Sequence, residues 1–275
     1  MIFAKDKGRM CNNILQFGHC YAWAREHGLK AVSMRFCYKY PGFRIRRARG
    51  HNYLTYLWAK YGSAMGLVPV VSFDDPAEDT ASVSAKLARL EKAAHRLPGA
   101  VMAGWQVRHY DLFLKYRDEI VSLFEFDDPA PRERRDNEVV LGVHIRRGDY
   151  DRWHNGKYFF TDDHYARAVR HFAALVEPSG RRVRVVLATN DRGLDAAAFA
   201  RSLGDAVTAV EGPADSAVAD LRALSQCDYI MGPPSTFSLV GAMYRDVPIR
   251  FMTAPEEPFT LDDFSDFAHL FRYEY

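Results

Sequence analysis

A chain of 275 residues with 48% hydrophobic and 26% charged residues is long enough to form one large globular domain or two smaller ones. Its 37 basic and 35 acidic side chains nearly cancel, which argues against a protein that binds nucleic acid through its overall charge. Any anion-binding site must therefore be a local feature.

The N-terminal sequence MIFAKDKGRM carries charges where a secretory signal peptide needs an apolar stretch. No segment approaches the ~20 consecutive apolar residues that span a bilayer. We therefore expect a soluble, cytoplasmic protein without a transmembrane segment. The cysteines form no C-x-x-C pair, so the sequence predicts buried, reduced thiols rather than a zinc site or a disulfide framework, at Cys11, Cys20, Cys37 and Cys227.

The first half of the chain alternates short apolar strands with helical patterns. Strands are predicted over residues 1–4, 30–34, 68–73 and 100–105, and helices over residues 13–28, 82–97 and 111–124. The segment DDPAPRERRDN, residues 127–137, then interrupts both patterns with prolines and charges. We place a linker there, between a first domain of residues 1–136 and a second of residues 137–275.

The second half repeats the alternation more regularly. Strands are predicted over residues 138–145, 183–190, 206–210, 228–231 and 247–252, and helices over residues 161–176, 194–204, 219–226 and 237–244. In the first of these helices, one apolar stripe contains Tyr165, Val169, Phe172 and Val176. Both halves are thus predicted to be doubly wound α/β domains, which bind ligands beyond the carboxyl ends of their parallel strands.

The strand at residues 138–145 leads directly into a cluster of charge. Because side chains alternate along a strand, His144 and Arg146 would share one face if the strand continued that far. An arginine can hold a phosphate through two charge-assisted hydrogen bonds and keeps its charge at neutral pH. Together with Arg147, these residues predict an anion site. The alternative is that Arg146 pairs with Asp149 and only fixes the turn.

Asp149 and Asp151 also match the D-x-D spacing of many sugar transferases. In those enzymes the two carboxylates hold a divalent ion on a nucleotide diphosphate, because hard cations prefer carboxylate oxygens. A metal-dependent nucleotide-sugar transferase is therefore an alternative hypothesis.

Two further strand ends carry polar side chains. Asn190 and Asp191 close the second strand of this half, either as ligand contacts or as helix caps. Ser235 and Thr236 follow two prolines and open a helix, whose free backbone N–H groups favour an anion. Simple N-capping is the alternative there.

A basic segment in the first half, FRIRRARGHNYLTYLW at residues 43–58, places several arginines ahead of aromatic residues. The arginines are Arg44, Arg46, Arg47 and Arg49. The segment could be the binding face of a non-catalytic glycan- or polyanion-binding module. It could also contact an acceptor, a membrane surface or only solvent.

These short motifs together resemble the fucosyltransferase superfamily that contains the α1,2-, α1,6- and protein O-fucosyltransferases. Residues 144–150, HIRRGDY, are similar to its H-x-R-R-x-D-Y motif, closest to the α1,2 branch. Residues 188–191, ATND, resemble the second motif, with Asn190 where an acid is usual. Residues 220–228, DLRALSQCD, followed by STFS at residues 235–238, resemble the third.

The opening motif of the family, G-R-x-G-N-Q, is similar to residues 8–13, GRMCNN. Cys11 stands where the family has glycine, and Asn13 stands where it has glutamine. The resemblance implies that Arg9 and Asn12 lie on the acceptor side of the active site.

The resemblance implies an inverting glycosyltransferase of the GT-B type, with two Rossmann-like domains facing a cleft. Such an enzyme transfers fucose from GDP-fucose to a glycan hydroxyl without a metal or another cofactor. The second domain would bind the donor, Asp220 would recognise guanine, and Arg146 and His144 would be catalytic. Further donor contacts implied are Arg147, Asn190, Asp191, Ser235, Thr236 and Phe237.

Physical chemistry agrees with this implication. Departing GDP develops negative charge on its β-phosphate, which a fixed Arg146 and the helix end at Ser235 and Thr236 would stabilise in the transition state. The sequence contains no G-x-G-x-x-G after a strand and no G-x-x-x-x-G-K-[ST], which disfavours a nicotinamide enzyme or a P-loop kinase.

Overall fold

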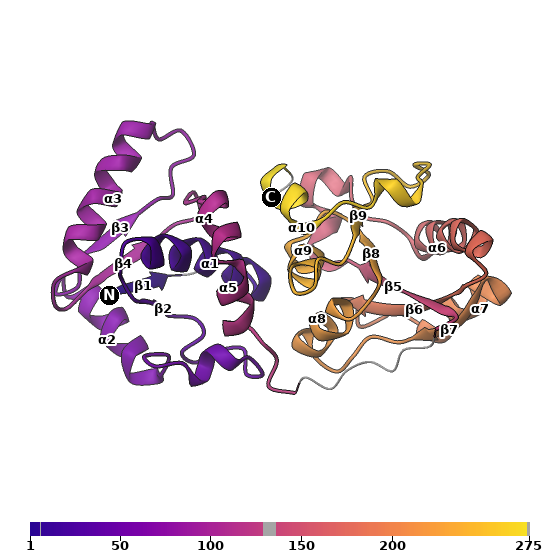
Figure 1. Ribbon diagram of the computed structural model, residues 1–275, viewed down its shortest axis with the longest axis horizontal. Coiled ribbons are helices and arrows are strands. Elements are labelled where there is room, and N and C mark those ends of the chain that lie inside the picture. Colours follow the sequence, from indigo (N-terminus) through magenta and orange to yellow (C-terminus); the bar gives the residue numbers. More distant parts are fainter. Residues whose placement is uncertain (6, 129–135, 274–275) are drawn as a thin grey trace. The chain divides into compact units, whose positions relative to one another are not determined.

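The computed structural model describes residues 1–5, 7–128 and 136–273, and the chain divides into two compact units, Met1–Pro129 and Ala130–Tyr275 (Figure 1). Each unit is built on one β-sheet, and every strand pair among the described residues is parallel. The predicted α/β class is therefore confirmed. The linker expected at residues 127–137 falls mostly on residues 129–135, outside the described residues.

The sheet of the first unit has the strand order β2-β1-β4-β3. Its strands are β1 (Ile2–Lys5), β2 (Ala31–Ser33), β3 (Val70–Ser72) and β4 (Ala100–Ala103). The neighbours β1 and β4 come from opposite ends of this unit's sequence. The crevice beyond their carboxyl ends is therefore a candidate ligand site by topology alone.

The helices of the first unit are α1 (Met10–Glu26), α2 (Tyr53–Ala64), α3 (Thr80–Ala94), α4 (Tyr110–Lys115) and α5 (Arg117–Leu123), with a 3-10 helix η1 (Arg44–Arg47). The single helix predicted at residues 111–124 was wrong, because the chain breaks between α4 and α5 at Tyr116, which has φ −105° and ψ 16°. α1 is buried on most of its surface and approaches α4 so closely that a Cβ on Gly18 would lie 2.1 Å from the Phe113 ring.

The sheet of the second unit has the order β7-β6-β5-β8-β9. This is the order of a doubly wound sheet, in which the chain adds strands first on one side of the first strand, β5, and then on the other. Its strands are β5 (Glu138–Ile145), β6 (Arg182–Thr189), β7 (Val207–Glu211), β8 (Tyr229–Gly232) and β9 (Ile249–Phe251). The strand order reverses between β5 and β8. Ligands of such sheets bind beyond the carboxyl ends at this point.

The helices of the second unit are α6 (Asp162–Val176), α7 (Ala196–Leu203), α8 (Ala217–Ser225), α9 (Thr236–Met243) and α10 (Phe267–Tyr273), with 3-10 helices η2 (Gly148–Asp151), η3 (Trp153–Gly156), η4 (Glu177–Ser179), η5 (Gly204–Ala206) and η6 (Leu261–Asp263). Figure 1 shows α6 and α7 on one side of the sheet and α8 and α9 on the other. The apolar stripe predicted for α6 is confirmed, since all four of its residues are buried.

Alternation along β5 decides which side chains reach the candidate site. Val143 and Ile145 face α6 in one apolar core. Gly142 faces α8, because a Cβ there would lie 2.7 Å from Leu224, and the side chain of His144 contacts α9. The even-numbered residues of β5 thus point toward α8 and α9.

The four cysteines are buried free thiols, as predicted. Among the described helices, none combines the length and the apolar character that crossing a membrane requires.

Candidate functional site

His144 is the last polar side chain of β5 and is only 2% exposed. Its Nδ1 lies 2.7 Å from the hydroxyl of Ser238 on α9, and its ring packs against Phe237 with the ring centres 4.9 Å apart. Burial, assisted by the charge of Arg146, lowers the pKa of His144 to about 3. The imidazole is therefore neutral at neutral pH.

Arg146 lies one residue beyond β5, because the strand ends at Ile145 rather than continuing through the arginine. Its Nη2 donates to Asp149 over 2.6 Å, and its guanidinium lies 5.1 Å from the centre of the Tyr150 ring. The pairing with Asp149 that the sequence left open is thus observed. It holds a largely buried cation in one orientation beside His144.

Arg147 turns to different partners. Its Nη2 lies 2.5 Å from Asp162 in the first turn of α6, and its guanidinium lies 5.3 Å from the Phe159 ring centre. The two neighbouring arginines are therefore not equivalent. Arg146 is held by η2, and Arg147 is held at the start of α6.

Asn190 fixes the turn after β5. Its Oδ1 accepts a hydrogen bond from the Arg147 backbone N–H (2.8 Å), and its Nδ2 donates to the Arg147 carbonyl (3.1 Å). Gly148 follows with φ +72°, and a Cβ there would lie 2.9 Å from the same Nδ2. Asn190 does not cap α7, whose N-cap is Asp195. The side-chain amide of Asn190 instead positions the arginine turn.

Asp191 shapes the loop that follows β6. Its Oδ1 accepts from the Gly193 backbone N–H (2.8 Å), and its own N–H donates to the hydroxyl of Thr189 (3.0 Å). That hydroxyl donates in turn to the Ile145 carbonyl (2.7 Å). The ends of β5 and β6 are therefore linked by side chains as well as by the sheet.

Asp220 lies in the first turn of α8 and is 4% exposed. It accepts hydrogen bonds from the backbone N–H groups of Ala214 (2.6 Å) and Thr189 (3.3 Å). Burial raises the pKa of this carboxyl to about 6, although the two hydrogen bonds act in the opposite direction. A carboxylate that titrates near neutrality thus lies beside the end of β6.

The start of α9 completes the site. Ser235 is the N-cap residue, and its hydroxyl accepts from the Phe237 backbone N–H (3.2 Å). β8 approaches β5 so closely here that a Cβ on Gly232 would lie 2.6 Å from the His144 carbonyl oxygen. The Tyr150 hydroxyl donates to the Pro234 carbonyl, which ties η2 to the loop before α9.

The structure therefore brings together the residues predicted at the ends of β5, β6 and β8. His144 and Arg146 lie beside the start of α9, where Thr236 begins the helix, and Asp220 is joined to them through Thr189. Sequence reasoning missed Ser238, although it lies within the STFS motif. The available signal was a serine among the apolar residues of a predicted helix, directly after the Ser235–Thr236 start.

The D-x-D pair is arranged differently from a metal site. Asp149 is paired with Arg146, and Asp151 lies 3.8 Å from the Nε of Arg152. Within the described ranges, no three side chains of His, Cys, Asp or Glu gather closely enough to hold a metal ion.

The two predicted acceptor-side residues lie in the first unit, at the start of α1. Arg9 is the N-cap residue of α1, and Asn12 lies in its first turn. Gly8 precedes them with φ +82°, and a Cβ there would lie 2.6 Å from the side-chain amide of Asn12. The glycine therefore permits the close turn from β1 into α1.

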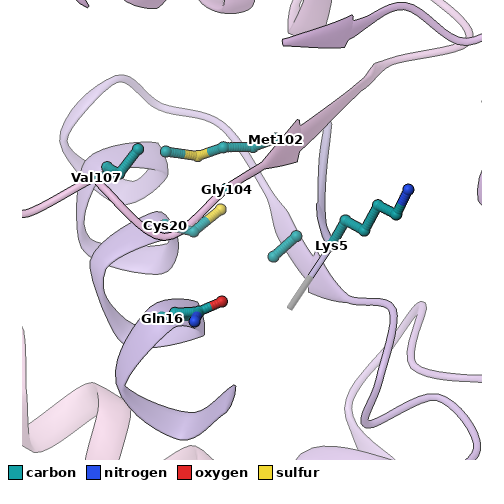
Figure 2. A pocket seen from close by; sticks show the side chains of 7 residues that line it. Lys5, Gln16, Cys20, Met102, Gly104 and Val107 are labelled. Carbon is teal, nitrogen blue, oxygen red and sulfur yellow. The ribbon is translucent and has the colours of Figure 1, made fainter. Parts of the chain in front are cut away.

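The first unit also contains a small pocket that sequence reasoning missed, at the carboxyl ends of β1 and β4. Its lining residues are Ala4, Lys5, Gln16, Cys20, Met102, Gly104 and Val107. Figure 2 shows Gln16 and Cys20 projecting from α1 toward the strand ends, while Lys5 extends away from them. These residue types give no chemical signal, and only the strand order indicates the location.

Comparisons with known proteins bear on the fold. No protein-family model matches the sequence, and no curated protein matches it. The chain is similar to crystal structures of POFUT1: the complex with GDP in crystal form III (12% identity, TM-score 0.53) and the complexes with GDP-fucose in crystal forms I (11%, 0.54) and II (11%, 0.51). These alignments cover 91%, 92% and 91% of this chain and 97% of each POFUT1 chain.

The chain has the GT-B fold. That prediction is confirmed by two parallel α/β sheets and by the extent of these alignments. An identity of 11–12% establishes the fold alone, so the activity has to be argued from the residues at the strand ends.

Proposed function

We propose that the protein is an inverting glycosyltransferase that moves fucose from GDP-fucose to a hydroxyl group of a glycan, in the manner of the α1,2-fucosyltransferases. One observation carries the proposal: His144, Arg146 and the start of α9 meet where the strand order of the second sheet reverses. The similar POFUT1 structures were solved with GDP or GDP-fucose, which supports this choice of donor.

The diphosphate is assigned to the site of Arg146. The guanidinium is oriented by Asp149 and Tyr150 before a ligand arrives, so little reorganisation is needed when charge develops on the leaving group. The backbone N–H groups at the start of α9 supply further donors. Both contributions strengthen as the sugar–phosphate bond breaks, which is what a catalytic contact requires.

The guanine is assigned to Asp220. Guanine presents N1–H and N2–H₂ side by side, and an ionised carboxylate can accept from both, whereas adenine has an acceptor at N1. Each oxygen of Asp220 has a second lone pair beyond its backbone hydrogen bond. With a pKa of about 6, the carboxyl is ionised at neutral pH. A neutral His144 lies nearby and can act as donor or acceptor.

The proposed reaction needs no metal, because a fixed guanidinium and a helix end face the departing phosphate. A metal-dependent site would require Asp149 and Asp151 together, but Asp149 is engaged by Arg146. The remaining donor contacts proposed are Arg147, Ser235, Thr236 and Phe237. In the structure Asn190 and Asp191 act on the backbone, so we assign them to positioning the site. Arg9 and Asn12 are proposed for the acceptor side.

The test is a transfer assay with a panel of sugar nucleotides and a panel of glycan acceptors. We expect acceptor-dependent release of GDP from GDP-fucose and an α-linked fucose on the product, measured by mass spectrometry and NMR. Turnover with a different sugar nucleotide, or glycan binding without any turnover, would replace the proposal by another transferase or by a non-catalytic module.

A further inference from the structure

The distribution of apolar side chains on α2 is the reverse of that on an ordinary surface helix. Leu54 is 77% exposed, Met65 just beyond the helix is 65% exposed, and Trp58 is 46% exposed. The side buried against the sheet carries Ala59 and Gly62 instead. Surface helices normally bury their large apolar residues and expose polar ones. α2 therefore presents its most hydrophobic face outward.

The packing of α2 explains why its large side chains do not turn inward. Ala59 belongs to the apolar core of the first unit with Phe3 and Val101. A Cβ on Gly62 would lie only 2.7 Å from Val68. The helix axis thus lies so close to the underlying chain that only small residues fit at Ala59 and Gly62, while Tyr56 packs against the same core as a partly buried side chain.

The exposed apolar residues form one continuous stripe. Leu54, Trp58, Tyr61 and Met65 follow one another at spacings of four, three and four residues, which places them on one face of a helix. Tyr53, the first residue of α2, and Leu67, two residues beyond Met65, are also exposed. We call this surface the α2 patch, and its members are Tyr53, Leu54, Trp58, Tyr61, Met65 and Leu67.

The segment of sequence that contains α2 carries charge of one sign. Residues 27–73 contain no aspartate or glutamate but carry eight cations, at Lys30, Arg35, Lys39, Arg44, Arg46, Arg47, Arg49 and Lys60. The whole chain has a net charge of +2, so the remaining residues together carry a net charge of −6. The basic character is therefore concentrated in the segment that contains α2.

Part of this charge is not neutralised by the residues that the structure describes. Arg44 and Arg47 of η1 pair with Glu125 (2.6 Å) and Asp127 (3.0 Å). Arg46 and Arg49 are exposed and form no ion pair with any other described residue.

Further cations lie along the patch itself. The ammonium of Lys60 lies 5.3 Å from the Tyr61 ring centre. Lys39 follows Tyr38, whose ring packs at a tilt against Tyr56 of α2 with the ring centres 4.4 Å apart. Cations thus lie beside the apolar stripe as well as at its start.

We propose that the α2 patch docks on the surface of an anionic lipid bilayer. The exposed apolar stripe enters the boundary between headgroups and acyl chains, its aromatic rings lie at headgroup level, and the surrounding cations contact lipid phosphates. A 12-residue helix is about 18 Å long, too short to cross the ~30 Å hydrocarbon layer, so α2 lies in the plane of the surface.

The positive charge of residues 27–73 favours an anionic bilayer over two other possible partners of the α2 patch. A second copy of the chain would bring the same cations to the same face, and like charges in an interface oppose association. A soluble polyanion would be held by the cations but would leave the apolar stripe in water. A bilayer with acidic lipids satisfies both features. The proposal does not depend on which sugar nucleotide the second unit binds.

Vesicle sedimentation tests the proposal on the full-length protein. We expect binding to vesicles that contain phosphatidylglycerol and much weaker binding to pure phosphatidylcholine, with a marked loss at high salt. The double variant Leu54→Ser/Trp58→Ser should weaken binding at least about tenfold, because two inserted side chains are lost. Arg46→Glu/Arg49→Glu should weaken it by a similar factor.

Matched controls separate a specific surface from a general loss of hydrophobicity or charge. Leu97→Ser removes another highly exposed leucine of the first unit, and Arg89→Glu/Lys92→Glu reverses two exposed cations on α3. Both controls should bind vesicles like the wild type. Thermal melts show whether each variant is folded. The shift of the melting midpoint by GDP reports separately on the second unit, which carries none of these substitutions.

Three outcomes would overturn the proposal. The first is no sedimentation with either kind of vesicle. The second is binding that Leu54→Ser/Trp58→Ser leaves unchanged, which would indicate a purely electrostatic polyanion site. The third is a dimer in solution that the same variant dissociates, which would assign the patch to a second copy of the chain. Quenching of Trp58 emission by brominated lipid, absent in Trp58→Phe, would add direct support for insertion.

Discussion

The two sheets of the protein carry different chemistry at equivalent places. In the second unit, the ends of β5 and β8 present His144, Arg146 and the start of α9. In the first unit, the ends of β1 and β4 border a pocket lined mainly by uncharged residues, among them Ala4 and Met102. Both places are selected by the same topological rule. The difference shows that strand order locates a candidate site, whereas side chains determine what it can bind.

The difference also extends to how the cations are held. Arg146 and Arg147 are anchored by Asp149 and Asp162 and are mostly buried, so their charges are fixed in a region of lower dielectric constant. The cation at the first-unit pocket is Lys5, an exposed side chain that extends away from the neighbouring lining residues (Figure 2). We therefore expect a diphosphate to bind at the second sheet and not at the first.

The largest expected effect comes from Arg146→Lys. A lysine keeps the positive charge but loses the planar guanidinium that engages Asp149 and stacks on Tyr150. Turnover should fall by about 100-fold or more, the typical cost of one donor to a developing oxyanion. Steady-state rates with GDP-fucose and acceptor measure the loss.

Two controls sharpen the contrast between the sheets. Arg147→Lys should be several-fold milder, because Arg147 is directed to Asp162 and Phe159. Lys5→Met removes the cation at the first-unit pocket and should leave the affinity for GDP unchanged. Equal losses for Arg146→Lys and Arg147→Lys would contradict the assignment of Arg146 to the leaving phosphate.

An intermediate effect is expected from the protonation of Asp220. Its folded-state pKa is raised from 3.8 to about 6, so the native protein holds this proton more tightly than the unfolded chain does. The contribution of Asp220 to stability is therefore fully present below pH ~4 and is lost as pH rises through ~6. GDP binding should show the opposite trend, because guanine needs the ionised carboxylate. Affinity should fall about tenfold between pH 8 and pH 5.

Asp220→Asn is the control for this pH dependence, because the phosphates of GDP also take up protons in the same range. The variant should bind GDP weakly, and its remaining pH dependence should be that of the ligand. It should also be less stable by about 1–3 kcal/mol, since an amide accepts one backbone N–H poorly where a carboxylate accepts two. Identical pH profiles for wild type and variant would assign Asp220 a structural role only.

The smallest expected effect is that of a chelator. If Arg146 and the start of α9 stabilise the leaving phosphate as proposed, EDTA should change the rate by less than about twofold. Loss of activity in EDTA that Mn²⁺ or Mg²⁺ restores would establish the metal-dependent alternative through Asp149 and Asp151.

Much of the fold could be predicted from periodicity. β5 is a run of apolar residues with strand-forming side chains, and the stripe of α6 has a clear helical repeat. Periodicity failed where packing decides. α2 was not predicted, because its large apolar residues face solvent and its inner face is made of Ala59 and Gly62. The break between α4 and α5 at Tyr116 was also missed, because the sequence of this segment has the pattern of one continuous helix.

The candidate site was predicted in part, because its side chains follow directly on strands. The sequence placed His144 and Arg146 at one strand end, and strand order brings that end to the start of α9. It could not show that Asn190 binds the backbone of Arg147, since that contact joins residues 43 positions apart. Nor could it find the first-unit pocket, whose residues carry no distinctive chemistry.

Thermal melting with GDP, ADP and UDP tests the central claim most directly, namely that the second sheet holds a guanine nucleotide. Free ligand at 100 times its dissociation constant adds ~2.7 kcal/mol to stability, which corresponds to a rise of ~5–10 °C in the midpoint for a chain of this size. GDP should produce this rise in the wild type, whereas ADP and UDP at the same concentration should have little effect. A melt in which UDP protects as well as GDP would contradict both the role of Asp220 and the choice of GDP-fucose as donor.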